Sequence, residues 1–178
     1  MSGNVTAMIR PILQLGDRAL REKSVPIEDF NSESLRQLVK DLSDTLQDAK
    51  KRLGYGRGIA APQIGELKRA VFVDTPAFKS ALVNPEITWV SDATFDVWDS
   101  CFSFNLAFFV LVSRNCSVKV DYLNLSGNRQ SLKAEADLSE LLQHEIDHLD
   151  GILATDRMKN KKAIMMRSEW EKTFKSQK

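Results

Sequence analysis

The sequence has few of the features that mark secreted, membrane-spanning or nucleic-acid-binding proteins. Its only two cysteines, Cys101 and Cys116, come without a secretory signal, so a metal-binding, catalytic or buried thiol is expected rather than a disulfide. The longest uninterrupted apolar run, residues 106–112, is far too short to span a bilayer, and residues 1–10 lack the apolar core of a signal peptide. With 25 Lys and Arg against 24 Asp and Glu, the net charge of +1 gives no general attraction for nucleic acid or an anionic membrane. We therefore expect a cytoplasmic protein with neither kind of partner.

The composition is that of a folded globular protein. Apolar residues make up 43% and charged residues 28% of the chain, a balance typical of ordinary soluble domains. A chain of 178 residues can bury a hydrophobic core without disulfides, and no repeat or flexible linker divides it. We therefore expect one domain that spans residues 1–178 and acts as a monomer.

Two amphipathic helices are predicted. Apolar residues recur on one helix face over residues 31–53, and Gly54 is placed to end that helix. A second helix is expected over residues 137–149, because Asp137 and Glu140 have the spacing of a capping box ahead of an apolar run. The second helix carries the residues on which the functional interpretation depends.

Strands are predicted in the middle of the chain, where short runs rich in β-branched and aromatic residues alternate with Pro, Asn and Gly. They cover residues 70–74, 81–84, 87–90, 109–112 and 117–123. A charged helix over residues 161–174 is expected to follow, with Ile164, Met165, Trp170 and Phe174 facing the body. This order of elements predicts an α+β fold, with antiparallel or mixed sheets around the second helix and further helices toward both ends of the chain.

A short motif on the second helix indicates metal-dependent hydrolysis. Residues 144–148 read His-Glu-Ile-Asp-His, and side chains four residues apart project from the same helix face. His144 and His148 can therefore bind one metal ion, at about 2.0–2.1 Å. Glu145 would then lie beside a water that the metal activates, accept its proton and return it to the leaving group.

The motif leaves its third metal ligand open. The chain has only two histidines, and a random placement gives this spacing in roughly one case in a hundred, so two structural histidines are the weaker explanation. A metzincin would need a histidine where Ala154 stands. Glu169 or Glu171 would complete a thermolysin-like set, and Cys101 would complete a set with a thiolate.

Three separated segments resemble the signature motifs of the peptide deformylase family. They are Gly-Arg-Gly-Ile-Ala-Ala-Pro-Gln at residues 56–63, Asp-Ser-Cys-Phe-Ser at residues 99–103 and Gln-His-Glu-Ile-Asp-His at residues 143–148. The similarity extends from about residue 9 to about residue 160. It implies an α+β fold with one divalent metal ion, Fe(II) foremost and zinc, nickel or cobalt as substitutes. The implied reaction removes the formyl group from the N-terminal methionine of nascent polypeptides, so the implied partner is a formylated peptide.

The resemblance also assigns the ligands. It implies that Cys101, His144 and His148 hold the metal and that Glu145 transfers the proton. A thiolate and two neutral imidazoles bind a borderline metal well and leave a coordination position for water. The alternative for Cys101 is a small buried hydrophobe, which is the preferred interpretation of Cys116, since no motif surrounds it.

Three further residues would act on the substrate. The side-chain amide of Gln63 and the backbone N–H of Phe102 resemble the donors that stabilise the oxygen of a tetrahedral intermediate. Losing one such donor typically costs about 10²–10³ in rate. Gly58, like Gly56, would give the permissive backbone that lets a peptide come close.

The second motif departs from the family's usual Glu-Gly-Cys-Leu-Ser. Asp99 is one methylene shorter than Glu, although it can still reach Arg114. Ser100 adopts positive φ less readily than Gly. We therefore expect the N–H of Phe102 to be displaced, while the ligand Cys101 keeps its place.

Arg57 and Asp137 stand where the resemblance puts an apolar pocket for the methionine side chain. One hypothesis is that the pocket accepts a polar or charged group. The alternative is structural: Asp137 caps the second helix, and Arg57 faces solvent or pairs with Asp137 or Glu140. Two further functions therefore stay open, a deformylase-like enzyme acting on another small N-acyl amide, and a homologue that binds metal or peptide with little turnover.

Overall fold

The computed structural model describes residues 8–175, so the ends of the predicted 1–178 domain lie outside the described residues. The α-helices in this range are α1 (Glu33–Leu53), α2 (Ala136–Leu149) and α3 (Arg167–Phe174). The strands are β1 (Gly58–Ala60), β2 (Ala70–Asp74), β3 (Lys79–Val90), β4 (Thr94–Asp99), β5 (Phe108–Asn115), β6 (Ser117–Leu123), β7 (Arg129–Glu135) and β8 (Ile164–Met166). Four short 3₁₀ helices complete the structure: η1 (Arg18–Arg21), η2 (Ala61–Ile64), η3 (Phe102–Phe104) and η4 (Ala154–Arg157). Within the described range, no helix has the length and apolar character needed to cross a membrane.

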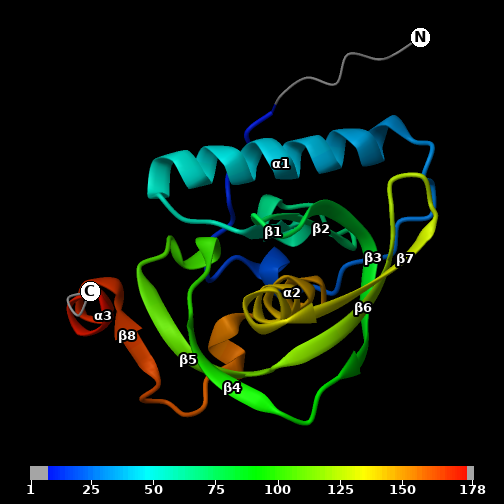
Figure 1. Cartoon of the computed structure of the whole chain (residues 1–178). Helices are drawn as coiled ribbons and strands as arrows, with labels where there is room; N and C mark the ends of the chain where they lie inside the picture. The colour runs from blue at the N-terminus through cyan, green and yellow to red at the C-terminus, as the bar shows by residue number, and fades with distance from the viewer. Residues whose placement is uncertain (1–7, 176–178) are drawn as a thin grey trace.

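Two antiparallel sheets surround α2. One sheet has the order β1-β2-β3-β6-β7, and the other has the order β4-β5-β8. Figure 1 shows α2 near the middle of the molecule, with α1 lying across the side that carries β1 and β2. The predicted α+β fold around the motif-bearing helix is confirmed.

Strand β2 belongs to the five-stranded sheet and is buried on both faces of that sheet. Successive residues of a strand point to opposite faces, so a strand between two helices is apolar throughout. Phe72 packs in one hydrophobic cluster with Leu42 and Leu46 of α1. Val71 and Val73 belong to a second cluster, which includes the apolar residues of α2. The sheet therefore fixes α2 on the side opposite to α1.

Helix α1 agrees with its prediction to within two residues. Ser32 is the N-cap, and its hydroxyl accepts a hydrogen bond from the N–H of Leu35 at 3.3 Å. Gly54 ends the helix in the left-handed region, with φ of 74°. The predicted apolar face is the buried one.

The predicted capping box at the start of α2 is wrong. Glu135 occupies the N-cap position without a side-chain cap, and Asp137 lies inside the first turn. The N–H of Ala136 donates to the carbonyl of Cys116 at 2.9 Å, which fixes the helix start against the connection between β5 and β6. Glu140 is bonded to Arg57 instead of the helix terminus.

The C-terminal segment also differs from its prediction. Residues 164–166 form strand β8, which pairs with β5, and the helix begins only at Arg167. An open edge of a sheet offers unpaired backbone groups, and this pairing satisfies those of β5. Met165 lies opposite Phe109 in the register, whereas Ile164 and Met166 are exposed. The prediction that Ile164 faces the body is therefore wrong.

Strand β3 joins two segments that were predicted as separate strands. Residues 81–84 and 87–90 both belong to it, although Pro85 lies between them. The pairing of β3 with β6 shifts register between Val83 and Glu86, and Asn84 has φ of 49°. Such a bulge accommodates a proline, because the ladder hydrogen bond is already interrupted there.

Candidate metal centre and active-site cleft

Helix α2 buries polar residues as well as apolar ones. His144, Glu145 and His148 are only 7%, 3% and 1% exposed. Buried polar groups need hydrogen-bond partners or a bound ligand. We therefore consider the hydrogen-bond partners and potential ligands around these three residues.

Cys101, His144 and His148 converge on one point. Each offers one ligand atom, and these three atoms lie within 4.8 Å of one another. Cys101 Sγ and His148 Nε2 are 3.2 Å apart. Cys101 reaches this position because it stands directly between strand β4 and helix η3.

The thermolysin-like alternative finds no support in the geometry. Glu169 is exposed and forms an ion pair with Lys172 at 2.8 Å. Glu171 pairs with Lys175 at 3.1 Å. Both glutamates belong to α3, and neither is part of a group of potential ligands with the two histidines in the described range.

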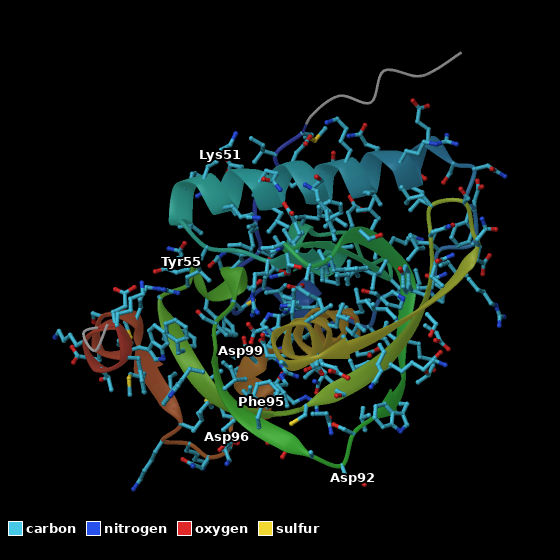
Figure 2. The ribbon with its side chains drawn as sticks, viewed as in Figure 1. Lys51, Tyr55, Asp92, Phe95, Asp96 and Asp99 are labelled. Atoms are coloured by element: carbon cyan, nitrogen blue, oxygen red, sulfur yellow. The ribbon has the colours of Figure 1, made fainter. Side chains whose placement is uncertain are left out.

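Asp99 orients the first histidine. Its Oδ2 lies 2.9 Å from His144 Nδ1, an arrangement that favours the tautomer with the proton on Nδ1 and leaves Nε2 for a metal. Burial opposes the charge of Asp99, but His144 and Arg114 together lower the pKa of this carboxyl below its usual range. Burial likewise opposes protonation of His144, yet Asp99 raises the pKa of its imidazole well above the usual value. Figure 2 shows Asp99 beside α2, at the end of the three-stranded sheet.

A chain of buried ion pairs supports Asp99 from behind. Arg114 donates to Asp99 at 3.2 Å and to Asp147 at 2.6 Å. Asp147 also accepts from Arg157 at 2.7 Å. The predicted contact between Asp99 and Arg114 is present, so the shorter carboxylate still connects the second motif with α2.

Ser100 fits its position without strain. It is absent from the described non-glycine residues with positive φ, so the missing glycine costs nothing here. Its hydroxyl donates to the carbonyl of Phe108 at 2.7 Å, which fastens the end of β4 to the start of β5. The reason for expecting a displaced N–H at Phe102 therefore does not hold. Phe102 is the first residue of η3, where N–H groups have no partner within the helix.

Glu145 is a buried carboxyl group in the wall of the site. Burial raises the pKa of its carboxyl to about 7 in the metal-free protein, although the nearby His144 acts in the opposite direction. Oε2 is buried and has no hydrogen-bond partner among the described residues. A Cβ at Gly58 would lie 2.6 Å from Oε1, so this carboxylate needs a glycine beside it.

Gln63 presents its amide nitrogen to the same point. Its Oε1 accepts from the N–H of Ala60 at 2.9 Å, which determines the orientation of the amide. Nε2 then donates to Cys101 Sγ and to Ser103 Oγ, each at 3.3 Å. The first and second motifs therefore meet at Cys101.

The segment before η1 holds these two motifs in place. The N–H of Leu13 donates to the carbonyl of Gln63 at 2.8 Å, and the N–H of Leu15 donates to the carbonyl of Ser103 at 2.7 Å. Gln14 adds a bond from its side-chain amide to the carbonyl of Phe102 at 3.2 Å. The opening of the chain thus braces the site without entering it.

A cleft of about 330 Å³ leads from this point to the surface. Its wall on the α2 side contains His144, Glu145 and Glu140, and Arg57 lies at its rim. Arg57 Nη2 lies 2.5 Å from Glu140 Oε2, and Nη1 donates to the Asp137 carbonyl at 3.4 Å. The side chain of Asp137 is exposed and does not line the cleft.

Sequence reasoning missed several residues of this cleft. Glu140 was interpreted as part of a helix cap or as a partner of Arg57; the pairing with Arg57 is confirmed, but its place in the cleft wall was not predicted. Trp98, Arg167 and Trp170 also line it, although none belongs to a recognisable motif. The apolar spacing of the C-terminal segment was the one available signal, and it did not indicate what the segment would cover.

Comparisons with known proteins agree with this geometry. The sequence profile of polypeptide deformylase matches residues 9–163. The peptide deformylase of Brachyspira hyodysenteriae is 40% identical over 161 residues, which cover 86% of this chain and 82% of that protein. The peptide deformylase of Caldicellulosiruptor bescii is 41% identical over 150 residues, or 84% of this chain and 86% of that protein.

Solved structures give the same result. The peptide deformylase of Thermotoga maritima superimposes with a TM-score of 0.79 at 31% identity and covers 86% of this chain and 99% of its own. The Acinetobacter baumannii enzyme, solved with Met-Ala-Ser bound, gives a TM-score of 0.77 at 29% identity and covers 86% of this chain and 100% of its own. This chain therefore belongs to the polypeptide deformylase family.

Proposed function

We propose that the protein removes the N-formyl group from the N-terminal methionine of nascent polypeptides, with one metal ion bound by Cys101, His144 and His148. The observation that carries the proposal is the convergence of these three ligand atoms at a cleft that Cys101, His144, Glu145 and Gln63 line. We also propose that the protein acts as a monomer in the cytoplasm, where nascent chains arise, without a nucleic-acid or membrane partner.

The donor set fits the proposed metal. One thiol and two imidazoles suit Fe(II), which we propose as the metal, with zinc, nickel or cobalt as substitutes. Glu145 Oε2 is a buried oxygen without a partner in the described range, as expected where a further polar group belongs. When bound, the metal ion supplies Lewis-acid chemistry, which makes a water nucleophilic near neutral pH and polarises a carbonyl oxygen.

Glu145 moves the proton in the proposed reaction. Its carboxylate takes a proton from the water as the water oxygen bonds to the formyl carbon. It then gives this proton to the amide nitrogen as the C–N bond breaks, so the products are a free amine and formic acid, which loses its remaining proton to become formate. In the metal-free protein burial raises the pKa of this carboxyl to about 7, which makes it a stronger proton acceptor than an exposed glutamate.

Gln63 and Phe102 stabilise the oxygen that becomes negative when water adds. Gln63 Nε2 donates to Cys101 Sγ and Ser103 Oγ, and in the proposed reaction one of these two N–H groups leaves its partner to donate to this oxygen. The N–H of Phe102, at the start of η3, is the second proposed donor. Both donors are neutral and held in place by the backbone, which suits stabilisation of a transient charge.

The proposed binding of the substrate's first side chain involves Gly58 and Arg57. Gly58 has no side chain, so a peptide can approach its backbone closely. Arg57 forms an ion pair with the almost buried Glu140 in the cleft wall. Asp137 contributes its carbonyl to Arg57, so its proposed role is to support this pair. The ion pair favours a second candidate function, an enzyme of this family that prefers a first residue other than methionine.

Anaerobically purified protein loaded with Fe(II) or Ni(II) tests the proposal. Incubation with formyl-Met-Ala-Ser should release formate, and acetyl-Met-Ala-Ser serves as the matched peptide. Peptide binding without formate release would indicate a binding homologue. Faster cleavage of the acetyl peptide would indicate a different acyl substrate.

A further inference from the structure

Helix α3 forms one wall of the cleft. Arg167, Trp170 and Lys175, from the helix and the residue after it, line the cleft together with Tyr55 and Phe109. The ring of Trp170 stacks on Phe109 with centroids 4.4 Å apart. Figure 2 shows Tyr55 just beyond the end of α1, on the side of the molecule where α3 lies.

Arg167 is held rigidly in this wall. Its guanidinium lies 4.8 Å from the ring centre of Tyr55 and 4.7 Å from that of Phe109. Nε donates to the carbonyl of Leu106 at 2.5 Å, and the backbone N–H donates to the carbonyl of Ala107 at 2.9 Å. A guanidinium has five N–H donors in a fixed plane, so donors remain for a ligand that enters the cleft.

The α3 wall carries excess positive charge. Arg167 and Lys175 share one carboxylate, that of Glu171, at 3.6 Å and 3.1 Å. Lys175 also donates to the hydroxyl of Tyr55, which keeps its ammonium group over the cleft. On the opposite wall, by contrast, Arg57 is matched by Glu140. The rim beside α3 therefore has one cation more than the described acids there can neutralise.

The burial of the cleft residues distinguishes the inner end of the cleft from its rim. His144 and Glu145, at the inner end, are almost fully buried, whereas Tyr55 is 42% exposed and the Lys175 side chain is 49% exposed. A peptide with its formyl group at the inner end must leave along the exposed rim. Formylation removes the positive charge of the amino terminus, so any charge that the peptide presents at the rim comes from its early side chains.

We propose that Arg167 and Lys175 form a subsite for a carboxylate two or three residues downstream of the formylated residue. This inference rests on the proposed function and makes the protein selective for formyl peptides with an acidic early sequence. Arg167 contributes a fixed planar fork, and Lys175 contributes a mobile point charge. Trp170 and Phe109 form the apolar floor between this subsite and the inner end of the cleft.

The first experiment compares formyl-Met-Ala-Glu-amide with formyl-Met-Ala-Lys-amide on the metal-loaded enzyme. The expected kcat/KM is about three- to tenfold higher for the Glu peptide, as for one or two partly exposed ion pairs. The preference should shrink as NaCl rises toward about 1 M, where the screening length falls to about 3 Å. Equal kcat/KM values for the two peptides at low salt would overturn the proposal.

Charge reversal at Lys175 supplies the decisive comparison. Lys175→Glu should abolish or invert the preference for the Glu peptide. Lys172→Glu makes the same change of charge three residues earlier, within α3, but Lys172 pairs with Glu169 and does not line the cleft. This control should keep the parent's preference. Identical preferences in the two variants would rule out the subsite.

A binding measurement separates this inference from the proposed function. Trp98 and Trp170 line the cleft, so their fluorescence can report the Kd of Met-Ala-Glu-amide and Met-Ala-Lys-amide. A tighter Kd for the Glu peptide in the parent and in Lys172→Glu, lost in Lys175→Glu, supports the subsite even if no formyl peptide is cleaved. Cleavage of formyl peptides with no difference in Kd would refute the subsite alone.

Discussion

The two walls of the cleft are built in different ways. On the α2 side, His144, Glu145 and His148 lie within five residues of one helix, and burial between two sheets fixes their direction. On the α3 side, Arg167 and Trp170 come from the end of the chain and reach the cleft only because β8 adds to β5. The α2 wall has its geometry set by helical spacing, whereas the α3 wall depends on tertiary pairing.

We therefore expect changes in the α2 wall to affect the reaction and changes in the α3 wall to affect the choice of peptide. A change in the α2 wall disturbs groups that have no alternative partner, so it should act on metal content and turnover. A change in the α3 wall alters a partly exposed surface, where ion pairs are worth little individually. It should act on the choice of peptide and leave the metal in place.

The largest expected effect is the loss of the metal in Cys101→Ala. Removing the thiolate leaves two imidazoles, so metal content measured by mass spectrometry should fall from one equivalent to nearly none, together with activity. Cys116→Ala is the matched control and should retain the metal. If Cys101→Ala kept its metal while Glu169→Ala lost it, α3 would supply a ligand and the contrast between the walls would fail.

Glu145→Gln should keep the metal and lose turnover. A glutamine can neither accept the proton of the water nor return it to the amine, and one positioned acid–base group is worth about 10²–10⁴-fold in rate. Steady-state kinetics and metal analysis on the same sample distinguish this outcome from misfolding. Rates near those of the parent would contradict the mechanism.

Asp99→Asn should lower the affinity for the metal, because Asp99 contacts the proposed ligand His144. The variant removes the charge that faces His144 Nδ1 and leaves Arg114 with one buried carboxylate fewer. Loss of such a partner typically costs about 10–100-fold in metal affinity, measurable by competition with a chelator. Asp99→Glu should restore most of the affinity, because it returns the carboxylate. Unchanged affinity in Asp99→Asn would show that the carboxylate does not orient the histidine.

The smallest effect is expected at the rim of the α2 wall. Arg57→Ile alone leaves Glu140 almost buried without its partner, so the pair is best replaced together as Arg57→Ile with Glu140→Leu. The double variant should raise kcat/KM for formyl-Met peptides by about three- to tenfold relative to peptides that begin with Lys or Glu, through added apolar contact. A parent that already prefers Met by a wide margin, with no gain in either variant, would show that the ion pair is structural.

The sequence predicted the parts of the site that are set by local spacing. The residues of α1, the strand β2 and the motif on α2 carry periodic or capped patterns, and each lies where those patterns indicate. Cys101 was identified through the resemblance of its segment, since nothing in its spacing from the histidines requires it to meet them. Its function as a ligand stays a prediction that Cys101→Ala tests.

The parts that failed depend on contacts between distant segments. The helical pattern after residue 160 could not reveal that β5 has an open edge, which turns residues 164–166 into a strand. Asp137 and Glu140 have capping spacing, but the bond from Ala136 to Cys116 starts the helix one residue earlier. Arg57, more than 80 residues before Glu140, then takes the carboxylate that the cap would have used.

The close packing at Gly58 has a consequence for directed evolution. Any side chain at this position would push against the carboxylate of Glu145, so a library at position 58 should return almost only glycine. Its neighbour Arg57 is half exposed and forms its ion pair with Glu140. Positions 57 and 58 should therefore differ sharply in the substitutions they tolerate. A paired library at positions 57 and 140 can test new substrates without a side chain that displaces Glu145.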